Sequence, residues 1–393
     1  MPLALLVLAI GAFAIGTTEF LTNGLLSSLA QEFGVSIPDA GMVTTSYALG
    51  QMCGPILALA LLRLPTKRAL LILMAIFTVG NLLAAISPNF GFLLGSRFAT
   101  AWSHTAFFGV ASVAASQLVP AKKQASAIAL VFTGLTLAML LGMPLGTLIG
   151  QMWGWRASFL IVTAISLASL VGIALLLPVE RNFEPAGYKQ SLRPFRNPRL
   201  WVALSATALG FGGHFASFTY IEPMLTGVSG FGQGEVIWLL GIYGAGLVVG
   251  NMLAGKAADR ALVRTTVTLL ILLSLTLLVL SFGASSKAVV IPALFLLGAC
   301  GFGLLTPLQT IVLRFAGPGS PLVGTANTAA LGAGIMLGSV LGALVLDSSG
   351  SFTAVNLAAA AMTVFGLVVY SVAAMNAKPR AGMRDSAKVS AAS

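Results

Sequence analysis

The few ionisable side chains that lie inside apolar segments of this chain are the residues whose types could do chemistry. The 393 residues include ten Asp and Glu residues and two histidines. Glu19, Arg97, His104 and His214 each lie within a long apolar run. A charged group inside a membrane helix costs about 2.5–3.5 kcal/mol on insertion scales, so such groups tend to face cavities and act in proton relays or binding. These four residues are therefore the first candidates for a functional site.

Glu19 and His104 suit proton exchange, and Arg97 shares a helix face with His104. At about 1.5 Å per residue, Glu19 lies about 25 Å along its run, and the spacing of seven places Arg97 and His104 on one helix face. Imidazole also titrates near neutral pH. Each residue has an alternative interpretation. Glu19 can instead be a carboxylate at the outer interface or a satisfied helix contact. Arg97 can be an arginine that extends to the membrane interface. His104 can be a neutral residue that makes one hydrogen bond.

His214 has aromatic neighbours in sequence, among them Phe218 and Tyr220. Aromatic residues around a polar group are typical of a largely apolar ligand cavity. They suit lipid-facing packing as well, and the sequence leaves both interpretations open. Glu222 closes the same run and is expected to be an exposed carboxylate. Asn327 can bond either across helices or to a substrate.

Twelve apolar runs must position these residues. Hydrophobic residues make up 58% of the chain and charged residues 8%, the latter about a third of the usual globular share. A bilayer core of about 30 Å requires about 20 apolar residues per helix, and lipid-exposed segments without strand alternation must be helices. The predicted spans are 3–29, 40–62, 69–87, 91–118, 125–150, 157–177, 200–225, 235–256, 265–283, 288–312, 321–346 and 353–375.

The basic residues fall into alternate gaps between these spans. Of the 21 Lys and Arg residues, 18 lie in six gaps. Cytoplasmic loops carry the excess of Lys and Arg in membrane proteins, so we expect a multi-pass protein of the cell membrane with both termini in the cytoplasm. The basic gaps are Arg63–Arg68, Lys122–Lys123, Arg181–Arg199, Lys256–Arg264, Arg314 and the tail from Lys378.

The same observations exclude several other classes. The basic residues are spread over loops without aromatic interleaving, so nucleic acid is not an expected partner. Cys53 and Cys300 lie inside apolar runs and indicate neither a disulfide framework nor a metal site. Without a Gly-rich phosphate loop, ATP hydrolysis has no support and no cofactor is expected beyond a proton gradient. A membrane enzyme would need clustered nucleophiles or acids, which the sequence lacks.

The chain divides into two related halves. The longest polar stretch separates six spans from six, which predicts a bundle at 1–178, a linker at 179–199, a second bundle at 200–376 and a tail at 377–393. Spans 2 and 8 both run from a glycine-led helix end into a basic loop, and spans 5 and 11 are both rich in glycine. Small residues let helices approach closely. An internal repeat of this kind is typical of secondary transporters, whose halves rock about a central site.

Three segments give the chain a specific resemblance. Span 5 carries Gly134 and then Gly142-Met143-Pro144-Leu145-Gly146, and is followed by Trp153-Gly154-Trp155-Arg156-Ala157-Ser158-Phe159. The others are Gly16-Thr17-Thr18-Glu19-Phe20 and Ser103-His104-Thr105-Ala106-Phe107-Phe108-Gly109. Over its whole length the chain resembles the major facilitator superfamily, and within it the twelve-span drug:proton antiporters, including chloramphenicol-resistance and arabinose-efflux-like permeases.

The resemblance implies a bacterial inner-membrane exporter, expected to be a monomer, that exchanges protons for a small neutral or weakly polar molecule. It implies proton-coupling roles for Glu19 and Arg97, to which His104 is added. A sugar or nucleoside efflux permease and an importer or facilitator remain alternatives. The candidate cavity residues on spans 1, 4 and 7 are Asn23, Phe107, Phe108, His214, Phe218 and Tyr220. The candidate conformational motifs are Gly142, Pro144 and Gly146, and Lys256, Asp259 and Arg260.

One position departs from the family pattern. The loop after span 2 normally carries an Asp before its first Arg, and Leu62 stands there in this chain. The loop after span 8 keeps the pair as Asp259-Arg260. We therefore expect the second copy of this cytoplasmic latch to carry more of its role than the first.

Overall fold

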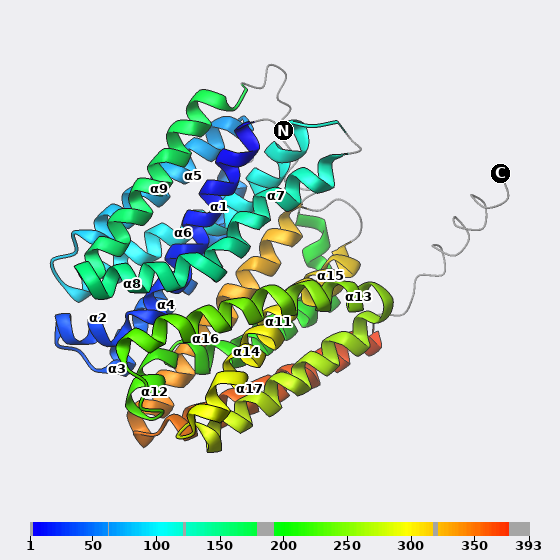
Figure 1. The fold of residues 1–393 in the computed structure, drawn as a ribbon. Helices are drawn as coiled ribbons and strands as arrows, with labels where there is room; N and C mark the ends of the chain where they lie inside the picture. The colour runs from blue at the N-terminus through cyan, green and yellow to red at the C-terminus, as the bar shows by residue number, and fades with distance from the viewer. Residues whose placement is uncertain (1–2, 62, 121–122, 179–191, 317–320, 377–393) are drawn as a thin grey trace.

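The computed structural model describes residues 3–61, 63–120, 123–178, 192–316 and 321–376, and in these ranges the regular structure is helical. Figure 1 shows long helices running side by side across the molecule, with the shorter α2, α3 and α12 together at one end. The predicted all-α polytopic fold is confirmed. Leu62, most of the predicted linker and the predicted tail lie outside the described residues.

The N-terminal half begins with α1 (Leu3–Leu21), which continues through the short turn η1 (Thr22–Gly24) into α2 (Leu26–Phe33). The other helices of this half are α3 (Ile37–Ala40), α4 (Met42–Leu61), α5 (Thr66–Ala85), α6 (Phe90–Gln117), α7 (Gln124–Leu137), η3 (Ala138–Gly142), α8 (Met143–Trp153) and α9 (Trp155–Leu176). The C-terminal half comprises η4 (Arg193–Arg196), α11 (Pro198–Phe218), α12 (Ile221–Gly227), α13 (Gln233–Gly283), α14 (Lys287–Gly303), α15 (Leu305–Ala316), α16 (Pro321–Ser349) and α17 (Phe352–Asn376).

Each of the twelve predicted spans is helical, but several are interrupted. Spans 8 and 9 are the two parts of α13, which are separated by a kink where Ala261 has a non-helical backbone (φ −151°, ψ 69°). Among the described residues, eight helical segments meet membrane-span criteria of length and hydropathy, α13 being one of them. The helices α4, α6 and α11 are not among these eight. They carry Gln51, Arg97, His104 and His214, and such polar side chains lower the mean hydropathy of a helix.

The interruptions are not visible in the hydropathy pattern of the sequence. In span 1, Thr22, Asn23 and Gly24 form a short 3₁₀ turn before α2. In span 5, the segment Ala138–Gly142 is a π-helical turn between α7 and α8. Such π-bulges are often found at functional sites. Gly154 (φ +82°) makes the turn between α8 and α9, a conformation that favours glycine.

The two halves meet through two equivalent helix pairs. Helix α4 packs on α16, and the first part of α13 packs on η3 and α8. The first contact joins spans 2 and 11, and the second joins spans 8 and 5. Because the sequence repeat relates span 2 to span 8 and span 11 to span 5, the two contacts are equivalent. Glycine permits both contacts: a Cβ at Gly332 would lie 3.0 Å from the carbonyl oxygen of Ala48, and one at Gly244 would lie 2.7 Å from that of Met139. The internal repeat is therefore visible in the packing between halves.

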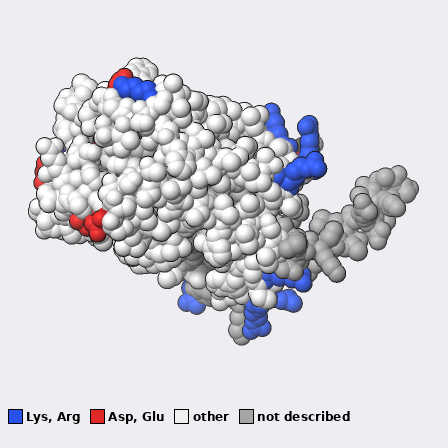
Figure 2. Space-filling model, turned by 90° about the horizontal axis from the view of Figure 1, so that it is seen from below, with Lys and Arg blue, Asp and Glu red and all other residues white. Residues whose placement is uncertain are grey.

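Charged residues gather at the two ends of the molecule and leave an uncharged belt between them. Figure 2 shows most of the visible Lys and Arg toward the right-hand end of the molecule, and the visible Asp and Glu toward the left-hand end. Large apolar side chains are exposed on the middle parts of the helices, including Leu167 (49%), Leu275 (51%) and Phe365 (58%). An exposed apolar surface of this extent suits lipid rather than water.

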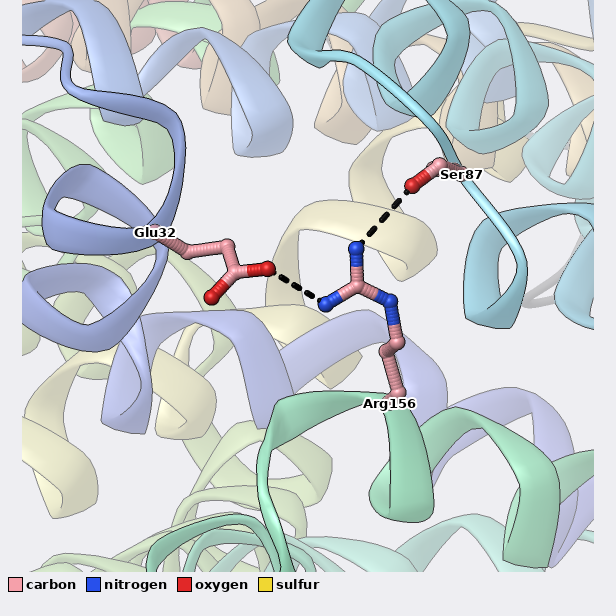
Figure 3. A network of polar contacts seen from close by, with 3 residues as sticks. All are labelled: Glu32, Ser87 and Arg156. Atoms are coloured by element: carbon pink, nitrogen blue, oxygen red, sulfur yellow. Dashed lines mark hydrogen bonds and ion pairs between the residues drawn. The ribbon is translucent and has the colours of Figure 1, made fainter.

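Arg156 ties the connections of the N-terminal half together at the sparsely basic end. Its guanidinium donates to Glu32 Oε1 of α2 at 2.5 Å and to the carbonyl oxygen of Ser87 at 3.2 Å (Figure 3). The guanidinium also lies 4.3 Å from the centre of the Trp155 ring. These contacts hold the start of α9 against two other connections at this end.

Candidate transport site

A cavity of about 660 Å³ lies between the two halves. Its walls come from α1, α4, α6, α7 and η3 on one side and from α11 and α13–α16 on the other. The lining extends along α6 to Ser116, along α13 to Asn251 and along α16 to Gly324. Along the chain, each of these positions lies within about ten residues of a predicted basic gap. The three gaps are 122–123, 256–264 and 314. The cavity thus extends from the centre of the molecule toward its basic end.

At the inner end of the cavity, four side chains form a hydrogen-bonded chain. Gln51 Nε2 donates to Glu19 Oε1 at 2.7 Å, and the same nitrogen lies 3.1 Å from His104 Nδ1. The Tyr47 hydroxyl lies 3.0 Å from that same Nδ1. Glu19, Gln51 and His104 line the cavity. The structure therefore brings two of the predicted proton-coupling residues together, through a glutamine that the sequence did not single out.

Arg97 lies behind this chain and is fully buried. Its Nη1 donates to Thr18 Oγ1 at 3.1 Å, and Thr18 in turn donates to Asn81 Oδ1 at 2.6 Å. The guanidinium lies 4.1 Å from the centre of the Tyr47 ring, a cation–π arrangement. No ion pair joins Arg97 directly to Glu19 or to another described carboxylate. An arginine that extends to the membrane interface is excluded.

The opposite wall of the cavity is lined by amide and hydroxyl groups. Asn327 Nδ2 donates to Gln309 Oε1 at 2.5 Å and Asn327 Oδ1 accepts from Thr207 at 3.0 Å. Thr306 donates to Asn251 Oδ1 at 3.1 Å. Among the described lining residues, Glu19 is the only carboxylate and no Lys or Arg occurs. Asn327 therefore bonds across helices and also lines the cavity, and a bond from Asn327 to the substrate stays a prediction.

The candidate cavity residues take different positions. Phe108 lines the cavity, whereas Asn23, Phe107, Phe218 and Tyr220 are buried outside its lining. His214 is also buried outside it, with Nε2 2.7 Å from the Tyr243 hydroxyl. Its ring stacks on Phe211, Phe218 and Tyr243. In this conformation the aromatic surface of the cavity comes instead from Phe20, Phe108, Phe132, Phe211 and Phe302.

Sequence reasoning missed Gln51 and most of the polar wall. Tyr47 and Gln51 lie four residues apart on α4, a spacing that puts two side chains on one helix face. Such a pair beside a predicted ionisable site could have been noticed. For Asn251, Thr306 and Gln309 the sequence offers no comparable signal, because single amides and hydroxyls in apolar helices do not reveal which way they face.

The end opposite the cavity is closed by contacts between the halves. Ser27 of α2 donates to Glu222 Oε2 of α12 through its backbone nitrogen at 3.0 Å and its hydroxyl at 2.6 Å. Gln233 Nε2 donates to Glu222 Oε1 at 3.2 Å, and Gln151 Nε2 donates to the Gln233 carbonyl at 3.1 Å. Glu222 is only 1% exposed. The expectation of an exposed carboxylate is wrong, because α12 turns this side chain into the junction with α2.

Substitution of Glu222 should weaken this closed junction. Because leaving buried donors unpaired costs about 1–3 kcal/mol, Glu222→Leu should raise the population of the open junction by about 5- to 150-fold. Ala40 is fully buried in this region, so Ala40→Cys in a background without native cysteines provides a reporter for labelling by maleimide. Labelling should increase with Glu222→Leu and with Ser27→Ala, and less than additively with both. Unchanged labelling would exclude the junction.

The predicted motif residues lie where helices of different spans meet. Glycines of span 5 face α1: a Cβ at Gly134 would collide with the backbone of Ala9, and one at Gly142 with Thr17. Gly146 is looser, since a Cβ there would lie 3.6 Å from Leu21. Pro144 stands in the first turn of α8. Span 5 therefore lies directly against the helix that carries Glu19, which is a placement suited to a conformational role.

The second motif lies in the middle of α13, where span 8 ends at the basic end of the molecule. Lys256, Asp259 and Arg260 are exposed, just before the bend at Ala261. Asp259 makes no ion pair with another described residue. A latch at this end would be broken in a conformation whose cavity extends toward the same end. The importance of Asp259 relative to Leu62 stays a prediction, since Leu62 is not described.

Two bundles of six spans, packed through equivalent helix pairs around a cavity that is closed at one end, define a membrane transporter. The chain belongs to the Major Facilitator Superfamily, whose family model matches residues 8–326 and again 230–390. It is 38% identical over 371 residues to the inner membrane transport protein YdhP of Escherichia coli (strain K12), covering 94% of this chain and 95% of YdhP.

Two further comparisons agree with this family. A chloramphenicol resistance protein of Streptomyces lividans is 33% identical over 351 residues, covering 88% of this chain and 90% of that protein. The fold is similar to that of a bacterial homologue of the human lysosomal transporter Spinster, solved in an inward-facing and occupied conformation. That match has a TM-score of 0.72 at 16% identity and covers 94% of this chain and 96% of the other.

Proposed function

We propose that this transporter exports a small neutral or weakly polar compound of the chloramphenicol type in exchange for protons. The observation that carries the proposal is the composition of the cavity, which joins a single carboxylate to aromatic and hydrogen-bonding walls. A strongly anionic substrate would require fixed cations and a dication would require paired acids. The similarity to a chloramphenicol resistance protein supports the same substrate class.

The proposed transport cycle uses Glu19 as the proton-exchanging group. Protonation of Glu19 removes the charge from the cavity, and its release restores the charge that Gln51 Nε2 contacts at 2.7 Å. The proton on Glu19 and the substrate share one cavity. Binding of the proton can therefore disfavour binding of the substrate, and the reverse, which is the requirement for exchange. The His104 imidazole is joined to Glu19 through Gln51. We expect the protein to act as a monomer, since one chain supplies every wall of the cavity.

A sugar-like or nucleoside substrate is the second candidate. The wall formed by Asn251, Thr306, Gln309 and Asn327 favours it, because amides and hydroxyls can pair with several hydroxyl groups of a ligand. The aromatic residues on the other wall suit a nitrophenyl group better than a pentose. A panel of compounds must therefore include both classes.

The proposed direction depends on the orientation of the chain in the membrane. If the basic end is cytoplasmic, the cavity faces the cytoplasm and can load a substrate for export. We predict cytoplasmic signals from reporter fusions in the basic gaps and external signals from fusions at the opposite end. The cytoplasmic fusions follow Lys67, Lys122, Lys189, Arg260 and Lys378, and the external ones follow Asn89, Gly230 and Ser349. An external signal at Lys189 would contradict the two-bundle topology.

Efflux from a pump-deficient host tests the substrate class. Expression should raise tolerance to chloramphenicol-like compounds more than tolerance to cationic dyes, and a protonophore should remove the difference. Strong dye resistance without any change for phenicols would reverse this ranking. Export of sugars or nucleosides without an effect on phenicols would favour the second candidate, and uptake of sugar phosphates in vesicles would overturn export itself.

A further inference from the structure

Gln51 stands between the two ionisable residues of the cavity and touches both with one nitrogen. Its Nε2 lies 2.7 Å from Glu19 Oε1 and 3.1 Å from His104 Nδ1. Its other polar atom, Oε1, is buried without a hydrogen-bond partner among the described residues. A primary amide nitrogen carries two hydrogens and no acceptor capacity. The amide therefore gives one hydrogen to each neighbour, and both neighbours must accept.

This arrangement restricts the proton positions of the two neighbours. Glu19 Oε1 accepts, which either oxygen of an ionised carboxylate can do but only the carbonyl oxygen of a protonated one can do well. His104 Nδ1 also accepts from Gln51, so a neutral His104 ring carries its single proton on Nε2. Nε2 makes no hydrogen bond with a described residue, and His104 lines the cavity. In this state His104 presents an N–H donor to whatever occupies the cavity.

The opposite orientation of the same amide suits the opposite protonation state. If the Gln51 carboxamide turns by a half-rotation, Oε1 replaces Nε2 beside Glu19 and His104. An ionised Glu19 would then face another acceptor at short range, whereas a protonated Glu19 could donate to it. His104 could donate to the second lone pair of Oε1 only from Nδ1–H, which leaves Nε2 as an acceptor toward the cavity. Each orientation leaves one amide group unpaired, so the protonation of Glu19 decides between them.

We infer that the Gln51 carboxamide links proton loading of Glu19 to the hydrogen-bonding character that His104 shows the substrate. With Glu19 ionised, His104 is a donor at Nε2, and with Glu19 protonated it is an acceptor. Exchange with cavity water moves the imidazole proton from Nε2 to Nδ1, so the ring stays neutral and Glu19 alone gains a proton. A substrate that accepts a hydrogen bond from His104 is held in one state and released in the other.

This inference rests on the proposed proton coupling and explains how that coupling can act on a neutral substrate. An uncharged ligand gains little from the charge of Glu19 directly, but it responds to the exchange of a donor for an acceptor. The surrounding groups permit the exchange. The other ionisable residues near the amide are Tyr47 on α4, Arg97 on α6 and, from the C-terminal half, Tyr243 on α13. Arg97 is stacked on Tyr47, and its Nη1 bonds to Thr18, so neither of these contacts competes for the amide.

The chain offers a direct spectroscopic test, because it holds only two histidines. Full-length protein labelled with ¹⁵N-histidine is titrated in lipid nanodiscs, and ¹⁵N chemical shifts report which ring nitrogen carries the proton. His214→Gln leaves His104 as the only labelled histidine. We expect the Nε2–H form at alkaline pH and the Nδ1–H form at acidic pH. The tautomer ratio should change by about tenfold, the scale of one net hydrogen bond.

Three variants separate the linkage from a merely structural role. Glu19→Gln should remove the pH dependence of the tautomer, and Gln51→Met should remove it while both ionisable residues remain. Gln309→Met alters another cavity amide, which bonds to Asn327 rather than to an ionisable group, and should leave the dependence intact. The titration of the wild-type protein tests the tautomer change without any substitution in the hydrogen-bonded chain. The inference can therefore be tested even if the Gln51 variant does not fold.

The outcomes also separate this inference from the proposed function. Chloramphenicol transport driven by a pH gradient is measured in liposomes from the same preparation. Coupled transport with a tautomer that stays constant, or with an imidazolium in the acidic form, overturns the Gln51 linkage alone. In the opposite case, the tautomer changes with the protonation of Glu19 while the protein shows no coupled transport of phenicols, sugars or nucleosides. That result overturns the proposed function alone.

Discussion

Glu19→Gln is expected to abolish uphill, proton-driven efflux while the protein still folds and inserts. The glutamine keeps the size and a hydrogen-bonding group toward Gln51, which contacts Glu19 at 2.7 Å, but it cannot exchange a proton. Loss of a positioned proton-transfer group typically lowers a rate by about 100-fold or more. Efflux is measured in energised cells, and downhill exchange of labelled substrate in liposomes shows whether the cavity still binds and moves its ligand.

Glu235→Gln serves as the matched control for this prediction. Glu235 lies in the first turn of α13, is exposed, and pairs with Lys287 at 3.5 Å. An exposed pair of this kind contributes little, so the control should keep coupled efflux. A Glu19→Gln protein with normal pH-driven accumulation would remove Glu19 from the mechanism. Equal losses in both variants would indicate a general defect rather than a coupling residue.

Arg97→Ala is expected to be as severe, and Arg97→Lys should not restore function. The fully buried guanidinium lies against the Tyr47 ring at 4.1 Å and donates to Thr18 at 3.1 Å. A lysine carries the charge but not the planar group that stacks and donates in a fixed direction. Both variants should reduce coupled efflux by about 100-fold. Expression and thermal stability in detergent show whether folding accounts for the loss.

Arg156→Ala provides the corresponding arginine control. Arg156 bonds to Glu32, and each side chain of this pair is 42% exposed, so the pair is worth about 1 kcal/mol or less. We expect nearly normal efflux from this variant. If Arg97→Ala were equally well tolerated, the buried cation would have no part in coupling, and the chain from Glu19 to Tyr47 would act without it.

The sequence predicted the spans well because membrane insertion depends on the length and polarity of segments, which any sequence displays. Twelve apolar runs became helices at nearly the predicted positions, and the glycines of spans 5 and 11 predicted where helices approach closely. The breaks at Thr22–Gly24 and at Ala138–Gly142 were not predicted. These depend on contacts between helices rather than on mean hydropathy.

The site was only partly predictable for a related reason. Glu19, Arg97 and His104 could be selected because ionisable residues are costly inside a membrane wherever they face. The face of an apolar helix that lines a cavity leaves no such signal. His214 therefore looked like a cavity residue but bonds to Tyr243 within an aromatic cluster, and Glu222 looked exposed but closes the junction with Ser27. Gln51 has no charge and was overlooked, although it joins the two ionisable residues.

Proton-driven movement of a neutral compound by the purified protein tests the central claim most directly. The protein is reconstituted into liposomes that contain a pH-sensitive dye, and labelled chloramphenicol is supplied outside with an imposed pH gradient. We expect the compound to accumulate in the compartment of lower pH while protons leave it, and we expect Glu19→Gln to prevent both movements. Accumulation that is independent of the gradient, or proton flow that the compound does not change, would contradict proton-coupled export.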